Sequence, residues 1–168
     1  MHTRNLGENV SSERGAILIH VGIALFALMG FTVFVLDYGV FWLGRREIQN
    51  AADAGALAGA ISRLFNETGT PMAGGPTETS ATLVAQSNHV VGATPGVAVS
   101  YGCPAFAPEA TWGRCVRVDA FRDGTNSSTP LPTYFGNLWG LTSQNVKATA
   151  TAQVRAANYS DCLKPWMI

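Results

Sequence analysis

The longest apolar segment, residues 16–36, is the feature that most limits how this chain can fold. It contains no Asp, Glu, Lys or Arg. A helix over it is roughly 30 Å long, the thickness of a bilayer's hydrocarbon core. No proline precedes Pro71, and after Asp37 the chain stays apolar and then becomes alanine-rich as far as Phe65. The sequence therefore predicts one long helix that crosses a membrane over 16–36 and continues to about residue 65 as a stalk.

Polar and aromatic residues mark the expected outer boundary of the membrane. Asp37 lies where the apolar thickness ends, and Trp42 belongs to an aromatic group typical of the headgroup level. Arg45 and Arg46 would then reach the lipid phosphates. We expect Asp37 to lie near the interface without a buried partner, with a polar contact to a partner helix as the alternative.

His20 is the one ionisable side chain inside the apolar segment. Such a group is a functional candidate by default, because ionisable side chains are costly in a bilayer. The alternative is a neutral imidazole bonded to the backbone or to a neighbouring helix, and we favour it.

Two features of the stalk predict packing. Gly55 and Gly59 form a G-x-x-x-G pattern, which indicates close helix pairing in a membrane and is weaker evidence outside one. Leu57, Ile61 and the pair Leu64/Phe65 form an i, i+4, i+7 row. We expect this bulky row to dock on the C-terminal part of the chain.

Residues 66–168 predict a small α+β domain outside the membrane. A helix is expected over 77–91, capped by its Thr/Ser-rich start, with Leu83 and Val84 facing inward. A second short amphipathic helix is expected over 131–141. Period-two alternation indicates half-buried strands of an antiparallel sheet; the runs are 97–101, 115–121 and 146–156. The predicted fold class is α+β, a long N-terminal transmembrane and stalk helix followed by a small antiparallel-sheet domain with short helices.

Cys103 and Cys115 flank a turn-rich segment between two of these strands. A disulfide there would close a short loop and add roughly 3 kcal/mol, provided the compartment is oxidising. The alternative is two buried thiols. Cys162 is left over, and we expect the protein to continue beyond Ile168.

Composition and motifs argue against several classes of function. Eleven basic and eleven acidic residues balance, so no overall field favours nucleic acid. No nucleotide-binding loop, nucleophile elbow or zinc-ligand spacing occurs. The sequence DGTNSS lacks the alternating ligands of a calcium loop and indicates a turn. We therefore expect no enzyme activity, no cofactor and no metal.

The N-terminal third resembles the TadG-like family of Flp (tight adherence) pilus assembly. The match lies in four features in the same order and spacing, and the rest of the chain agrees in outline, with a short F-G-x-L-x-G helix (135–140) and an alternating A-T-A-T-A-Q-V strand. The four features are Arg14-Gly15 before the apolar span, Asp37-Tyr38-Gly39 at its end, the pair Arg45-Arg46, and the alanine-rich helix from Ile48 to Ala60.

The resemblance implies a component of a Tad-type secretion and pilus system, anchored once in the bacterial inner membrane. Residues 1–15 would be a cytoplasmic tail, and the domain would be periplasmic or extracellular. Expected partners are the membrane itself, other pilus-assembly or pseudopilin subunits and further copies of the chain. Some relatives carry a von Willebrand A-like domain further on, and none fits here.

Two rival functions stay open. The first is a pilin-like subunit that polymerises through its N-terminal helix. Gly15 is placed like the glycine of a prepilin-peptidase site, but the fifth residue after it is His20 where those pseudopilins have glutamate. The second is a signal-anchored binding protein that uses Trp112, Trp139 or Trp166 for glycans.

Overall fold

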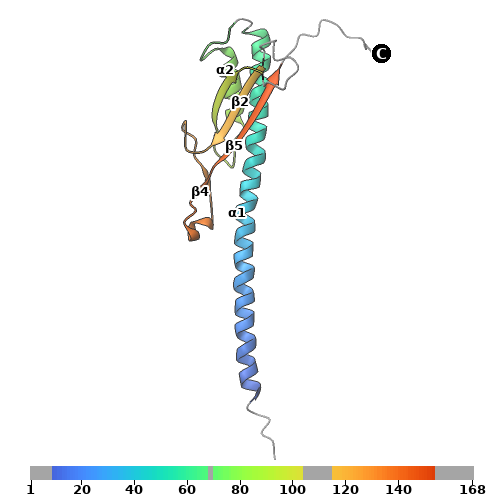
Figure 1. Cartoon of the computed structure of the whole chain (residues 1–168), viewed down its shortest axis with the longest axis vertical. Coiled ribbons are helices and arrows are strands. Elements are labelled where there is room, and N and C mark those ends of the chain that lie inside the picture. Colours follow the sequence, from blue (N-terminus) through green and yellow to red (C-terminus); the bar gives the residue numbers. More distant parts are fainter. Residues whose placement is uncertain (1–8, 68–69, 104–114, 154–168) are drawn as a thin grey trace, which may run out of the picture.

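One uninterrupted helix, α1 (Asn9–Phe65), dominates the structure. The structure is a computed structural model that describes residues 9–67, 70–103 and 115–153 (Figure 1). At 57 residues, α1 is about 85 Å long. Its N-terminal half projects beyond the rest of the molecule, and by length and composition it can cross a membrane. The predicted single long helix is therefore confirmed.

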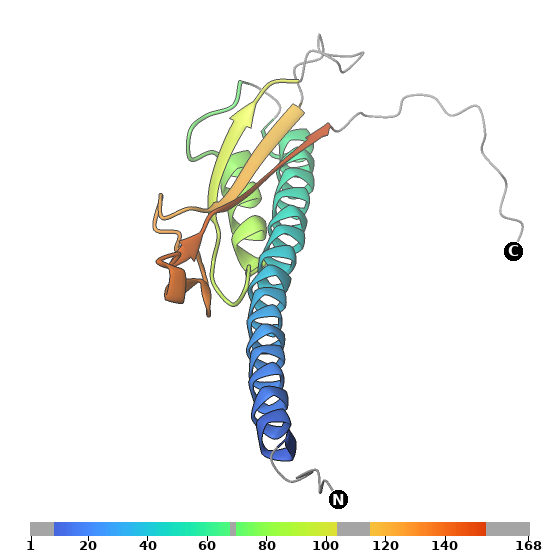
Figure 2. The same ribbon diagram turned by 60° about the horizontal axis from the view of Figure 1, so that its bottom comes forward.

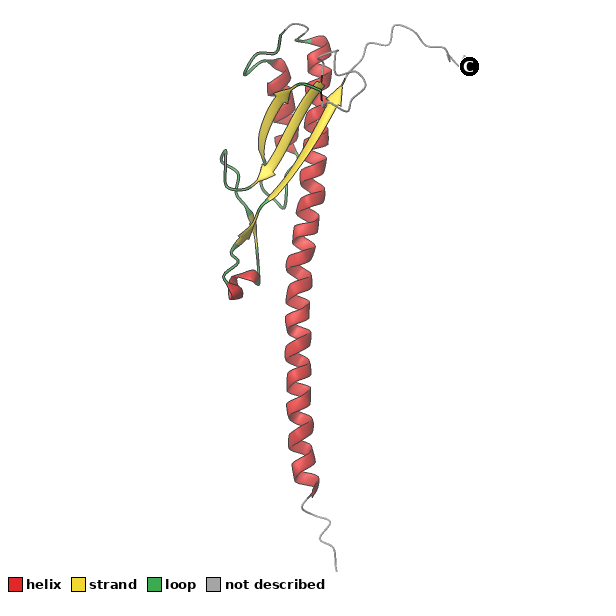
Figure 3. Ribbon diagram, viewed as in Figure 1, coloured by secondary structure: helices red, strands yellow, loops and turns green. Residues whose placement is uncertain are grey.

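The remaining elements form a small antiparallel sheet with one further helix (Figure 3). Strands β1, β2 and β5 make a three-stranded sheet in the order β1-β2-β5, and β3 and β4 pair separately. The predicted α+β class is confirmed. The elements are α2 (Pro76–Ser87), β1 (Gly96–Tyr101), β2 (Cys115–Arg122), β3 (Leu131–Pro132), the 3₁₀ turn η2 (Gly136–Trp139), β4 (Ser143–Gln144) and β5 (Val146–Gln153).

The sheet turns one face toward the two helices, which lie side by side against it (Figure 2). Val118 of the central strand lies opposite Val99 of β1 and Ala150 of β5. The small inward residues of β5 leave the room that α1 occupies. The core between sheet and helices consists mainly of small side chains; its buried members are Ile48, Ala51, Ala52, Ala56, Ala60, Ala81, Ala85, Val90, Val116, Val118, Ala120, Leu131, Val146 and Ala150.

The face of α1 that docks on the domain is its glycine and alanine face. The expectation that the bulky row would dock was wrong: Leu57, Ile61 and Phe65 are 59%, 54% and 73% exposed, and Leu64 is only partly buried. Small residues recur every four positions on the docked face, so the backbones of α1, α2 and β2 can approach closely. Larger side chains there would hold these layers apart.

Gly55 and Gly59 lie at the closest approach between α1 and its own domain. A Cβ atom on Gly55 would lie 2.9 Å from the Ala81 carbonyl oxygen and 2.9 Å from the Ala85 Cβ. One on Gly59 would lie 2.9 Å from a methyl of Val116. The G-x-x-x-G pattern therefore packs α1 against α2 and β2 of the same chain.

We expect Gly55→Ala to destabilise the domain by about 1–3 kcal/mol, because the new methyl group collides with backbone that cannot move away. This loss exceeds the gain in helix propensity of about 1 kcal/mol. Unfolding of the full chain in detergent, followed by circular dichroism, measures it. Gly39→Ala is the matched control, since a Cβ there meets no atom within 4 Å. Equal stability of the two variants would contradict the packing role of Gly55.

Helix α2 has the expected position but not the expected orientation. Its buried residues are Thr77, Ala81 and Ala85, whereas Leu83 is 63% exposed. Val84 is 37% exposed and is not among the buried residues of the helix, so the prediction that both face inward was wrong. The same close packing explains this, since α2 meets Gly55 and Gly59 through its own small residues. The predicted Thr/Ser cap was wrong too, because Gly75 takes the N-cap position with no side-chain hydrogen bond.

Residues 131–141 do not form the predicted amphipathic helix. They form β3, the single turn η2 and the start of the return to β4. Pro132 cannot donate a helical hydrogen bond, and Gly140 ends the turn in the left-handed region at φ 80°. The Tyr134 side chain in this segment is exposed.

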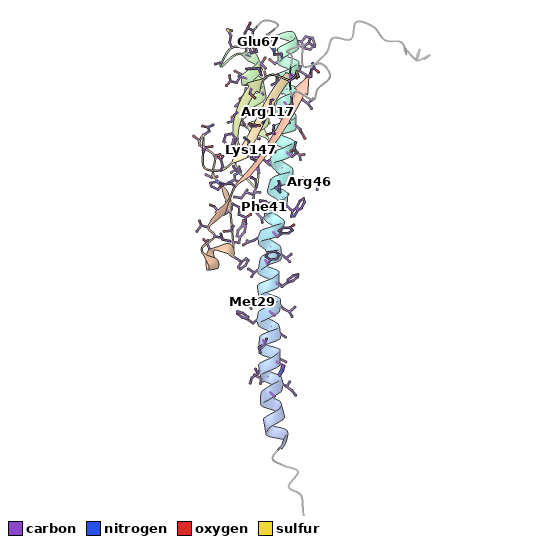
Figure 4. The ribbon with its side chains drawn as sticks, viewed as in Figure 1. Met29, Phe41, Arg46, Glu67, Arg117 and Lys147 are labelled. Atoms are coloured by element: carbon purple, nitrogen blue, oxygen red, sulfur yellow. A yellow bond between two sulfur atoms is a disulfide. The ribbon has the colours of Figure 1, made fainter. Side chains whose placement is uncertain are left out.

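The outer face of the sheet carries a charge cluster around Asp119. Its carboxylate lies 3.1 Å from Lys147 Nζ and 3.3 Å from Arg117 Nε, and it accepts a hydrogen bond from Thr149 Oγ1; Figure 4 labels Arg117 and Lys147. Burial raises the pKa of Asp119, but the hydrogen bonds from Thr149 and Lys147 and the charges of Lys147 and Arg117 outweigh it. The net result is a pKa below the usual value of 3.8.

The direction of this shift gives a pH dependence. Because the pKa of Asp119 is lower in the folded chain, its stabilisation is present above about pH 4 and is lost as the pH falls through the folded value. We expect Asp119→Asn to cost less than about 1 kcal/mol at pH 7, since the paired side chains are exposed. Melting curves at pH 7 and pH 3 measure the difference, which should shrink at pH 3. A constant difference would contradict the charge pairing.

Candidate functional site

The carboxylate of Asp37 binds three consecutive backbone N–H groups of the turn between β3 and β4. The N–H of Tyr134 donates to Oδ1 at 2.9 Å, and that of Gly136 donates to Oδ2 at 2.7 Å. The N–H of Phe135 is shared between the two oxygens, at 3.3 and 3.1 Å. The prediction that Asp37 needs no buried partner did not include these three N–H groups, which are exposed or partly buried. Its carboxylate joins α1 to a loop that is 97 residues away in sequence.

The turn has its shape because of its glycines and Thr133. A Cβ atom on Gly136 would lie 2.8 Å from the Leu141 carbonyl oxygen and 3.0 Å from the Thr133 Cβ, so only glycine fits. The Leu141 N–H donates back to Gly136 O at 2.9 Å, and the Thr133 hydroxyl donates to Leu141 O. These bonds use the carbonyl groups inside the turn and leave the N–H groups of 134–136 directed at Asp37. Such a concave set of N–H groups is a typical site for an anionic oxygen.

An apolar cavity of about 360 Å³ lies beside this carboxylate, between α1 and the β3–β4 turn. On the helix side it begins within the apolar segment, at Gly30, and on the other side it reaches Leu141 and Gln144. It is therefore placed where the predicted membrane boundary lies. Its lining residues are Gly30, Val33, Phe34, Asp37, Tyr38, Phe41, Gly136, Leu141 and Gln144.

The other predicted boundary residues lie on the same stretch of α1. Trp42 is exposed and stands edge-on to Tyr38, with ring centroids 6.2 Å apart. The Arg45 guanidinium lies 5.5 Å from the centre of the Phe41 ring, a cation–π contact. Arg46 is exposed and lies on the side of α1 away from the sheet (Figure 4). The aromatic and basic residues thus lie within one short stretch of α1, residues 38–46, as residues at a membrane interface do.

A second junction lies about ten residues further along α1. The Val91 N–H donates to Glu47 Oε2 at 2.6 Å, and Arg122 Nη1 donates to Val90 O at 2.6 Å. Arg122 is 3% exposed and also donates to Thr129 and Pro130, so it ties the end of β2 to two loops. Val91 has φ 46°, a rare conformation for a β-branched residue. The two junctions fix to the helix the end of the domain that lies nearest the apolar segment.

The remaining predicted residues have the following places. Cys103 and Cys115 form the predicted disulfide, with Cα atoms 5.0 Å apart, which joins the end of β1 to the start of β2. The His20 Nδ1 lies 2.7 Å from Ala16 O, in agreement with the favoured backbone-bonded imidazole. Trp112, Cys162 and Trp166 lie outside the described residues.

The site has the chemistry of a docking joint. Asp37 receives four hydrogen-bond contacts on its two oxygens, so its lone pairs are largely used and it is poorly placed to accept a substrate proton. In the part of the chain that the structure describes, no cluster of three or more His, Cys, Asp or Glu residues could hold a metal ion. The arrangement fixes the position of the domain along the helix axis and its orientation around that axis.

The sequence singled out Asp37 but did not predict its hydrogen-bond partners. The three groups that bind it are backbone N–H groups, which every residue except proline carries, so side-chain patterns give no signal for them. The glycine pair Gly136 and Gly140 was the available signal, because it favours a turn over the helix predicted there.

The comparison with family models matches residues 15–62. The matching model is the Tad family, whose description is "Putative Flp pilus-assembly TadE/G-like". It covers the apolar half of α1, Asp37 and the glycine face, and it confirms the resemblance seen in the sequence over these residues. No curated protein and no solved structure matches the chain.

Proposed function

We propose that this chain is a membrane-anchored, non-enzymatic component of a Flp/Tad-type pilus assembly or secretion system. The observation that carries the proposal is the helix matched by the pilus-assembly family, which combines two surfaces. Its N-terminal half is an apolar rod whose side chains are almost all exposed, except near the contact of Asp37 with the β3–β4 turn. Its C-terminal half is the support on which the domain packs. One rigid element therefore serves as both anchor and scaffold.

The mechanism we propose is presentation of the domain at a fixed distance from the membrane. The small-residue face from Ile48 to Ala60 fixes the sheet on the helix, and the Asp37 joint fixes the β3–β4 turn at the boundary. A partner that approaches from the membrane plane would then meet a surface of constant height and orientation. No chemistry on a substrate is required for this role.

We further propose that the anchor is in the bacterial inner membrane, with the domain on the periplasmic or extracellular side. The disulfide between Cys103 and Cys115 supports this orientation, because such bonds persist in oxidising compartments. Extraction of membranes with alkaline carbonate should leave the chain in the pellet. In intact cells, a membrane-impermeant maleimide should label both cysteines only after reduction. Labelling that requires lysis of the cells would contradict the orientation.

The assembly role itself is tested by deletion and complementation. Deleting the gene should reduce surface pili, and the intact chain should restore them. A chain with residues 16–36 replaced by a cleavable signal peptide, which exports the domain without the anchor, should fail to restore them. Normal pili in the deletion strain would overturn the proposal.

A pilin-like subunit is the second candidate, and the exposed apolar row on the stalk favours it. N-terminal sequencing of the membrane-bound and filament fractions separates the two functions. Filaments that contain this chain beginning at Ala16 would establish the pilin-like subunit. Membrane-bound protein that retains Met1 would leave the anchored component as the better description.

A further inference from the structure

We infer that the β3–β4 turn, residues 131–144, is a second membrane contact of this chain. The turn inserts into the leaflet on the domain's side of the membrane, and a phospholipid acyl chain occupies the cavity between the turn and α1. The inference rests on the membrane anchor of the proposed function, and it adds a second membrane-binding element and the chemical class of its ligand.

The turn lies beside the apolar part of α1, further toward the N-terminal end of the helix than the three-stranded sheet (Figures 1 and 3). Asp37, directly after the apolar segment, binds the N–H groups of residues 134–136. The cavity continues from Asp37 along α1 to Val33 and Gly30. Gly30 precedes Asp37 by seven residues, which is about 10 Å along the helix. With residues 16–36 in the membrane, the cavity therefore lies on the lipid side of the boundary.

The segment placed at this depth carries no charge. No Asp, Glu, Lys or Arg occurs between Asp123 and Lys147. Within it, the Tyr134 and Leu141 side chains are 62% and 61% exposed. Lys147, where charge returns, lies further from the apolar segment than Phe41 does (Figure 4). Exposed aromatic and aliphatic side chains without neighbouring charges are typical of elements that enter a membrane interface, which reach about 5–10 Å into it.

The backbone of the turn meets the condition for non-helical chain in lipid. Hydrocarbon offers no hydrogen-bond partners, so irregular backbone at membrane depth has to be satisfied by the protein itself. The N–H groups of residues 133–136 are bonded to Thr142 O and to the Asp37 carboxylate. Those of residues 140 and 141 are bonded to carbonyl groups within the turn. The turn therefore enters the interface with these polar groups already paired.

The lining of the cavity favours an acyl chain over a polar ligand. Its helix side consists largely of apolar and aromatic side chains, and the oxygens of Asp37 already receive four hydrogen-bond contacts from the turn. Phe34 lines the cavity but is 63% exposed, so the cavity is continuous with the lipid-facing surface of the apolar segment. A lipid chain that packs on Phe34 can enter the cavity without crossing water.

Spin labels measure the depth of the turn in the full chain, with Cys162→Ser as background and the native disulfide retained. Leu141→Cys carries the label, and Leu83→Cys is the matched control because the two leucines are 61% and 63% exposed. In lipid nanodiscs we expect the ratio of oxygen to nickel-chelate accessibility to be about fivefold higher at position 141 than at position 83. Equal ratios at the two positions overturn the inference.

Ile23→Cys, within the apolar segment, separates this inference from the proposed function. A lipid-exposed label at position 23 together with a water-exposed label at position 141 refutes the inference and leaves the anchor intact. A water-exposed label at position 23 refutes the membrane anchor, and with it the proposed function on which the inference rests.

Photolabelling identifies the occupant of the cavity, in nanodiscs that contain a phosphatidylcholine with a diazirine in its acyl chain. Trypsin cuts after Arg122 and Lys147, so the whole turn lies in one peptide, 123–147. We expect this peptide to be labelled, and Gly30→Leu to reduce its labelling about threefold, because leucine fills part of the cavity. Gly22→Leu is the matched control: a Cβ at either glycine meets no atom within 4 Å, but Gly22 does not line the cavity. An unlabelled peptide, or labelling that Gly30→Leu leaves unchanged, overturns the inference.

Labelling in native membranes distinguishes lipid from a protein partner as the occupant. The same diazirine lipid, supplied to membranes that contain the whole assembly, should label peptide 123–147 to within about twofold of the level in nanodiscs. Loss of labelling in native membranes alone would assign the turn to a partner protein and overturn the inference.

Discussion

Replacing Asp37 with alanine is expected to release the β3–β4 turn from α1. The substitution leaves the N–H groups of Tyr134, Phe135 and Gly136 without their acceptor. Hydrogen bonds to a charged group contribute about 1.5–3 kcal/mol each, and water will replace part of this. We expect a net loss of about 3 kcal/mol in the local stability of the turn, which is about a hundredfold in amide exchange. Hydrogen exchange with mass spectrometry on peptides from 131–144, in lipid nanodiscs, measures it.

Asp53→Ala is the matched control for Asp37→Ala. Both are aspartates on the same helix, but among the described residues Asp53 accepts a hydrogen bond only from Gln49, one turn away. Exchange over 131–144 should not change in this control. Asp37→Asn should fall between the two, because the amide keeps one oxygen and turns an NH₂ group toward N–H donors. Unchanged exchange in Asp37→Ala would show that the turn is held by the cavity's apolar contacts and not by the carboxylate.

The sequence predicted the elements whose signal is contained in a short run of residues. The long helix followed from an unbroken apolar and alanine-rich segment, and the strand 146–153 followed from strict alternation. The disulfide followed from two cysteines that flank a turn between strands. In each case a local pattern in the sequence is enough to determine the element, and packing in the domain stabilises it further.

The prediction failed where two surfaces have to fit each other. Hydrophobicity alone favours Leu57 and Leu83 as buried residues, but the helices meet through Gly55, Gly59 and Ala81. When two backbones approach closely, van der Waals contacts form along the whole interface. The hydrophobic pattern of one helix alone does not predict this gain. The bulky row then lies on the outer face, where the chain's own domain does not cover it. The hydrogen-bond partners of Asp37 were missed for the same reason, because they are backbone N–H groups of a turn that is distant in sequence.

Arg122→Met is expected to be the most destabilising of the substitutions considered. The Arg122 guanidinium is buried, and its donors satisfy the Val90, Thr129 and Pro130 carbonyl oxygens and the Thr129 hydroxyl. Methionine fills much of the volume but leaves these acceptors buried and unpaired. The expected loss is about 3–5 kcal/mol, since each buried unsatisfied group costs about 1–3 kcal/mol. Denaturant unfolding of the full chain in detergent measures it.

Arg117→Met separates the loss of these hydrogen bonds from the general effect of removing an arginine from β2. Arg117 lies on the same strand, but half of its side chain is exposed, and in the part of the chain that the structure describes it pairs only with Asp119. A change below about 0.5–1 kcal/mol is expected there. Arg122→Lys should recover only part of the loss, because an ammonium cannot reach acceptors on both sides as a planar guanidinium does. If Arg122→Met were as stable as Arg117→Met, the loops at Val90 and Thr129 would be held by other contacts. The membrane-proximal end of the domain would then depend on Asp37 and Glu47 alone.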